Sequence, residues 1–107
     1  SPQDSQTQVI TFRSTPQPAY VAEAITEGPI PTSEIVSVDD KTVQSVENDT
    51  YNNTYVVQLR VTLQVDTTSD GLATFQGERL YIGRDLTLDL GSTIIDGVVV
   101  DIGSRSP

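Results

Sequence analysis

The residues of this chain that could take part in chemistry are amides, carboxylates and hydroxyls, because it contains no cysteine and no histidine. The segments Asn48-Asp49-Thr50 and Asn52-Asn53-Thr54 both match the acceptor pattern for N-glycosylation. They lie in a polar run that we expect to be an exposed loop, where an acceptor is accessible. The sequence therefore predicts possible N-glycosylation at Asn48 and Asn52; the alternative is an unmodified polar loop.

Two groups of closely spaced acids raise the question of a calcium site. They are Asp39-Asp40 and the run from Asp66 to Asp70. Calcium takes about six to eight oxygen ligands, and neither group has the spacing of an EF-hand loop. Nor does any pattern place two carboxylates across a cleft for glycoside hydrolysis. Solvated surface carboxylates are the better interpretation, so the sequence predicts no metal ligand.

The chain also lacks the usual nucleophilic and phosphate-binding motifs. Without histidine a serine–histidine–aspartate triad cannot form, and serine–lysine catalysis would depend on Lys41, the single lysine, in an expected turn. The phosphate-binding pattern G-x-x-x-x-G-K is absent from the sequence. We therefore expect no enzymatic activity, no catalytic residue and no cofactor.

The charge balance is strongly acidic. Fifteen acids, ten of them aspartate, stand against six bases and give a net charge of −9 over 107 residues. Such a surface repels nucleic acids and anionic lipid headgroups, so neither is expected as a partner. Many aspartates with one lysine indicate a halophilic, archaeal source, because dense carboxylates keep a protein hydrated in strong salt. The alternative is an ordinary acidic exported protein.

Two stretches carry the clearest strand periodicity. Residues 86–90 alternate leucine with polar side chains, Gly91-Ser92 supplies a tight turn, and 93–102 is rich in β-branched residues. Within that return strand Gly97 predicts a bulge or sharp bend, which would curl the sheet. Residues 55–67 carry the second clearest alternation and predict the central strand. Its inward face would consist of Val57, Leu59, Val61, Leu63 and Val65.

Weaker patterns predict the remaining elements. These are a strand at 8–13, a helix at 19–26 ended by a left-handed Gly28, a hairpin of 34–38 and 42–47 around a turn at 39–41, and a short strand at 72–75. A helix of about two turns does not persist alone and must dock on the sheet. We expect one domain, with a flexible lead-in at 1–8, the β domain at 9–103 and a flexible tail at 104–107.

The predicted fold is mostly β, a small partly open β-barrel or sandwich of about six or seven strands, with one short helix near residues 19–26. Several segments of this pattern resemble an uncharacterised prokaryotic family of small β domains. The segments are VAEAITEG at 21–28, YVVQLRVTLQV at 55–65, FQGERLYIGRDLTLDL at 75–90 and GVVVDI at 97–102. The family's L-x-I-G signature fits Leu80, Ile82 and Gly83, and its closing G-x-V-x-x-I signature fits Gly97, Val99 and Ile102.

The resemblance implies a topology rather than a reaction. In that family the domain follows a single N-terminal membrane helix, which would precede Ser1, and no activity is assigned to it. We therefore expect a non-enzymatic, membrane-anchored, extracytoplasmic domain that acts with an unknown protein partner in assembly or binding at the cell envelope. The alternative is a ligand-binding module for cations or carbohydrate. A polar pocket of converging acids would favour the latter, and a filled core with an exposed sheet edge the former.

Overall fold

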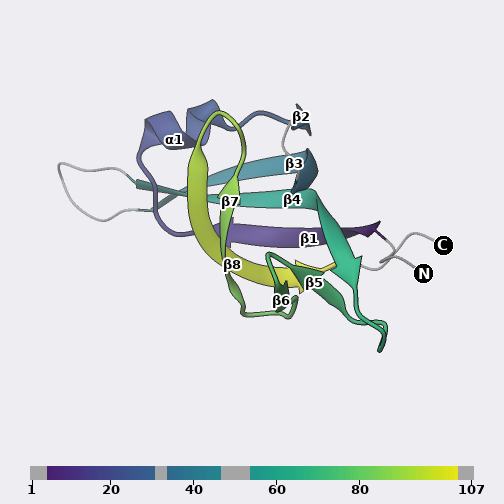
Figure 1. Ribbon diagram of the computed structural model, residues 1–107. Coiled ribbons are helices and arrows are strands. Elements are labelled where there is room, and N and C mark those ends of the chain that lie inside the picture. The colour runs from purple at the N-terminus through teal and green to yellow at the C-terminus, as the bar shows by residue number, and fades with distance from the viewer. Residues whose placement is uncertain (1–4, 31–33, 47–53, 104–107) are drawn as a thin grey trace.

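The computed structural model describes residues 5–30, 34–46 and 54–103, which form one antiparallel sheet of eight strands and one short helix (Figure 1). The elements are β1 (Ser5–Ser14), α1 (Ala19–Ala24), β2 (Gly28–Pro29), β3 (Ile35–Val46), β4 (Thr54–Thr67), β5 (Ala73–Phe75), β6 (Glu78–Arg79), β7 (Asp85–Asp89) and β8 (Ile94–Ile102). The strand order is β2-β3-β4-β1-β8-β7, with β5 paired to β4 and β6 to β5. The sheet is not closed, so the predicted mostly-β, partly open fold is confirmed. The strand number exceeds six or seven because β2 and β6 are too short to show periodicity.

Strand β4 is central, as its alternation predicts. It pairs with β3 on one side and with β1 on the other. Its five inward aliphatic side chains are all buried; they are Val57, Leu59, Val61, Leu63 and Val65. The pairing with β1 begins at Ser5, so residues 5–8 belong to the sheet and not to the expected lead-in.

The C-terminal hairpin covers the inner face of the other strands. Leu86 and Leu88 of β7 and Leu90 directly after it are buried, which confirms the predicted apolar face of residues 86–90. Strand β8 curves strongly, and with β7 it passes in front of β1, β3 and β4 in Figure 1. The hydrophobic core lies between these two parts of the sheet, and it includes Ile10, Phe12, Ile35 and Phe75.

Of the two roles predicted for Gly97, a bulge or a sharp bend, the bulge is wrong. The β7–β8 register is unbroken through Gly97, which pairs with Leu86, and the irregularity in β8 instead falls opposite Thr11 and Phe12. A Cβ atom at Gly97 would lie 2.5 Å from Cζ of Phe12 and 2.8 Å from Cα of Ser14. Glycine is therefore needed there because the Phe12 ring and the β1 backbone cross β8 at this point.

The predicted hairpin at 34–47 is wrong, because β3 is one continuous strand. Asp39 and Asp40 do not form a turn; the register with β4 shifts between Ile35 and Ser37 and again between Val38 and Asp40. Such irregularities let β3 stay one strand through the two acids. The Asp39 carboxylate accepts hydrogen bonds from the hydroxyls of Ser37 (2.7 Å) and Thr62 (2.6 Å), which satisfies it within the strand.

Helix α1 has six residues and ends at Ala24, two residues before the predicted end. Ile25 is extended and buried, so it leaves the helix to fill the core. Gly28 has a positive φ of 126°, but it pairs with Val38 as part of β2 instead of capping the helix. No helix within the described residues is long and apolar enough to cross a membrane.

Two side chains, Gln76 and Arg84, link the β5–β6 hairpin to the neighbouring parts of the sheet. Gln76, at the turn of that hairpin, donates from Nε2 to the Thr87 carbonyl of β7 (3.1 Å) and to the Glu34 carboxylate (3.2 Å). Arg84 is 5% exposed and donates from one guanidinium nitrogen to the Glu78 carbonyl (2.9 Å). The hairpin therefore covers part of the opening that backbone pairing leaves in the barrel.

Replacing Gly97 with alanine should lower the free energy of unfolding by about 3 kcal/mol, because β1 backbone atoms cannot move away from a new Cβ. This value is at the upper end of the range for substitutions that overpack a core. Gly91→Ala, which introduces strain at a φ of 85° in open space, should cost only about 1 kcal/mol. Urea unfolding of both variants measures the difference. Equal losses would show that the crossing at Gly97 can relax.

Candidate functional site

The outer edge of β3 exposes backbone groups that are not used by the sheet. On β4, the amide of Val57 donates to the Ser14 hydroxyl (2.9 Å), and the amide of Tyr55 donates to the Gln17 carbonyl (2.8 Å), both on the β1 side. Val43 and Ser45 stand opposite these residues. In an antiparallel pair, opposed residues point their backbone groups either toward or away from each other together. The N–H and C=O groups of Val43 and Ser45 therefore point away from β4.

On the side away from β4, no described strand pairs with that part of β3. Among the described residues, β2 pairs with β3 only at Ser37 and Val38. Next along the edge, the amide of Lys41 donates to the Glu27 carboxylate (3.1 Å), which ends the covered part of the strand. We define the β3 edge as residues 43–45. Val43 and Ser45 direct their backbone groups outward there, and on that outer side no described strand pairs with them.

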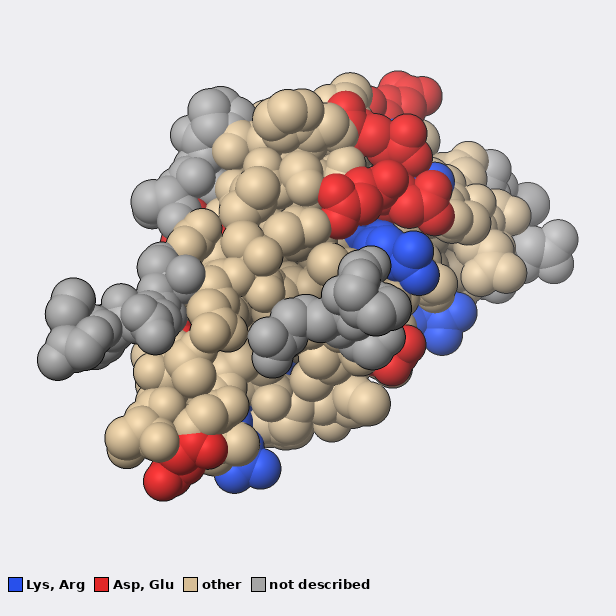
Figure 2. Space-filling model, turned by 90° about the vertical axis from the view of Figure 1, so that its right-hand side faces the viewer, with Lys and Arg blue, Asp and Glu red and all other residues tan. Residues whose placement is uncertain are grey.

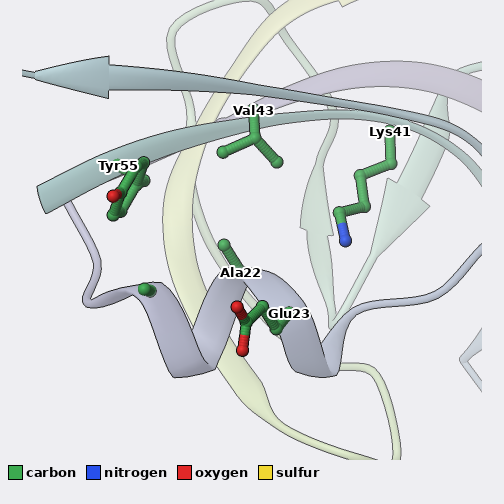
Figure 3. A pocket seen from close by; sticks show the side chains of 6 residues that line it. Ala22, Glu23, Lys41, Val43 and Tyr55 are labelled. Atoms are coloured by element: carbon green, nitrogen blue, oxygen red, sulfur yellow. The ribbon is translucent and has the colours of Figure 1, made fainter.

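A groove lies next to the β3 edge, between α1 and the ribbon that β3 and β4 form. Its volume is about 210 Å³, and it is lined by Ala19, Ala22, Glu23, Lys41, Val43 and Tyr55. Figure 3 shows the side chains of Val43, Tyr55 and Lys41 projecting from the strands toward the helix that carries Ala22 and Glu23. Val43 is 42% exposed, so the groove opens at the same edge that presents the free backbone groups.

Lys41 has a structural role in this groove. Its ammonium donates to the Ile25 carbonyl (2.7 Å), just beyond the last residue of α1. From the other side, the Ser92 hydroxyl donates to the Ala24 carbonyl (2.7 Å). A helix this short cannot satisfy its own C-terminal carbonyls, so these two donors hold α1 between β3 and the β7–β8 turn. The expected place of Lys41 in a turn is wrong, since it lies within β3.

The acids singled out in the sequence do not converge. Asp39 and Asp40 lie on β3, whereas Asp66 lies at the end of β4 and Asp70 in the following turn. No group of three or more acids within the described ranges could hold a metal ion. The possible glycosylation sites Asn48 and Asn52 lie outside the described residues.

The outer face of the β3–β4 ribbon has a smaller hollow. Its volume is about 150 Å³, and its lining residues are Thr11, Asp40, Thr42, Gln58, Leu59 and Arg60. Asp40 stands directly opposite Arg60 in the register, so one acid faces one base. This lining has no aromatic side chain on which a sugar ring could stack, and it does not present the converging acids that would favour a cation module.

Comparison with known proteins adds no relative. Scans of family models, curated proteins and solved structures found no match to this chain. The site therefore rests on its geometry. The sequence did not reveal the β3 edge, because the predicted turn at 39–41 hid the continuity of β3. Glu23 of α1 and Tyr55 of β4 line the groove together only in the folded chain. The sequence did predict a strand over 42–47, but no local pattern showed that one of its edges is unpaired.

Replacing Lys41 with methionine should lower the free energy of unfolding by about 1–2 kcal/mol, because the Ile25 carbonyl loses a charged donor. Arg60→Met removes a cation from the outer face of the same ribbon, where the side chain is exposed, and should change stability by less than about 0.5 kcal/mol. Thermal or urea unfolding compares the two. Equal effects would show that the Lys41 bond does not stabilise α1.

Proposed function

We propose that this domain is a non-enzymatic protein-binding module that recruits a partner by adding an extended segment of it to the β3 edge. The observation that carries the proposal is the set of outward N–H and C=O groups of Val43 and Ser45. An unpaired strand edge is a template for another strand, and main-chain hydrogen bonds supply the affinity in such complexes. The adjoining groove gives the added strand a place for its side chains.

The packing of the rest of the domain supports a surface role. Nineteen hydrophobic side chains of the described residues are buried in the core. The described residues contain no buried side-chain polar atom without a hydrogen-bond partner. Together with the scattered acids, a filled core favours binding at the surface over binding inside the barrel.

We further propose that the module is extracytoplasmic and anchored to the membrane by a helix preceding Ser1, and that it assembles with a protein of the cell envelope. The sequence resemblance supports the anchor, and the acidic composition suits a halophilic cell. Figure 2 shows carboxylates gathered in the upper part of one face, with basic side chains directly below them. Together with the net charge of −9, this surface favours a protein partner over nucleic acid.

A photo-crosslinking amino acid at Thr42, beside the β3 edge, should form an adduct of defined mass with one partner in the source cells. Ser45→Pro should reduce the adduct at least about tenfold, because it removes an edge N–H while leaving the ladder with β4 intact. The same crosslinker at Asp85 on β7 is the control. No adduct, or an adduct only between two copies of this chain, would contradict partner recruitment.

Gln44→Pro, at the residue before Ser45, is a matched control for the stability of Ser45→Pro. Gln44 has the opposite phase, so its N–H points toward β4, and Gln44→Pro should lower the free energy of unfolding by about 1–3 kcal/mol. Ser45→Pro should stay within about 1 kcal/mol of the parent. Urea unfolding of both variants tests whether Ser45→Pro removes the Thr42 adduct without unfolding the domain.

The proposed location at the cell envelope is tested by fractionation and by mass measurement. The full-length protein from its source cells should be recovered with the membrane fraction, and its mass should exceed the polypeptide mass by glycans mapped to Asn48 or Asn52. Thr50→Ala and Thr54→Ala each remove one acceptor and should remove the corresponding glycan. An unmodified protein in the soluble fraction would contradict the envelope assignment.

A further inference from the structure

We propose that the segment added to the β3 edge places a lysine or arginine side chain in the groove between α1 and the ribbon. Its aliphatic stem would pack on Val43 and Ala22, and its cation would lie between the Glu23 carboxylate and the Tyr55 ring. This inference rests on the proposed function, and it specifies the chemistry of the partner.

Strand geometry places one partner side chain at the groove. A strand added to a sheet lies about 4.8 Å from its neighbour, and directly opposed residues point their side chains to the same face. Val43 points its side chain into the groove, as Figure 3 shows. The partner residue opposite Val43 therefore also faces α1, and it fills the open side of the groove.

The groove lining fits a long cationic side chain. Glu23 supplies a carboxylate, Tyr55 supplies an aromatic face, and Ala19, Ala22 and Val43 supply aliphatic surface. Lysine and arginine bury their methylene stems along apolar surface while their charged ends reach a polar group. A cation near an aromatic face gains further attraction. An acidic residue would face Glu23 directly, and an aliphatic residue would desolvate that carboxylate without pairing it.

Lys41 does not occupy the place of the incoming cation. Its ammonium donates to the Ile25 carbonyl, at the C-terminal end of α1. Tyr55 lies at the opposite end of the groove in Figure 3, with Val43 between them. The two cations are therefore separated along the groove, and the Tyr55 end is the one that is left for the partner.

A second copy of this chain fits the β3 edge poorly. Each copy carries a net charge of −9, so two copies repel each other. Strand β3 contains one basic residue, Lys41, and its ammonium is already bonded to Ile25. Self-pairing therefore leaves Glu23 without a cation, which favours a basic segment of a different protein.

Synthetic peptides test the proposal directly. The panel consists of three strand-forming peptides of roughly eight residues that alternate threonine and valine. They differ at one central position, which is lysine, glutamate or methionine. Calorimetry should show that the lysine peptide binds at least about tenfold more tightly than the glutamate peptide, and severalfold more tightly than the methionine peptide. Hydrogen exchange should show that binding protects the amides of Val43 and Ser45.

A matched pair of variants separates the local contact from the overall charge. Glu23→Gln should weaken the lysine peptide about five- to tenfold and leave the methionine peptide unchanged or slightly tighter. Asp70→Asn, which changes the net charge equally in a turn after β4, should change the affinity less than about twofold. Equal weakening by both variants would overturn the Glu23 contact.

The same experiment distinguishes the two proposals. If all three peptides bind equally and protect Val43 and Ser45, strand addition stands and the cation in the groove is wrong. If no peptide binds and both amides exchange as in the free domain, strand addition at the β3 edge is wrong as well. Preferential binding of the lysine peptide, lost in Glu23→Gln and kept in Asp70→Asn, supports both.

Discussion

The constraint on which the rest of this structure depends is the burial of one face of β4. Its five alternating aliphatic side chains need a cover, while its backbone is already hydrogen bonded to β1 and β3 on either side. Other elements must therefore pack on the inner face of the sheet to cover these side chains. The curve of β8, the position of α1 and the return of the β5–β6 hairpin all supply parts of it, and together they make a barrel that stays open at one side (Figure 1).

The same strand determines which edge is exposed. Because Tyr55 and Val57 direct their amides to Gln17 and Ser14 on the β1 side, the opposed residues of β3 direct theirs outward. Natural sheets usually cover or block such an edge. Here, among the described residues, Glu27 and β2 cover its first part, and the groove lies beside the remainder. Backbone groups and a pocket for a side chain at the same place are the two components that strand-adding domains use.

Much of the fold was predictable, because period-two alternation reports directly on which face is buried. It held for β4 and for the leucines of β7. It failed where tertiary contacts override local signals: the acids at 39–40 have the composition of a turn, yet Ser37 and Thr62 satisfy Asp39 within a bulged strand. Gly97 looked like a bend, but its reason is the Phe12 ring, which approaches from a strand far away in sequence. The candidate site was not predictable, since no local pattern places Glu23 and Tyr55 in the lining of one groove.

The sequence by itself determined the strand content, the inward face of the central strand, the acidic surface and the absence of histidine and cysteine chemistry. These are properties of composition and of local periodicity, which need no knowledge of neighbours. Only the tertiary structure decided the continuity of β3, the end of α1 and the place of the groove. These depend on pairing register and on contacts between distant residues, such as Lys41 with Ile25. A hydrogen-bond direction is fixed when strands pair, so the exposed edge exists only in the folded sheet.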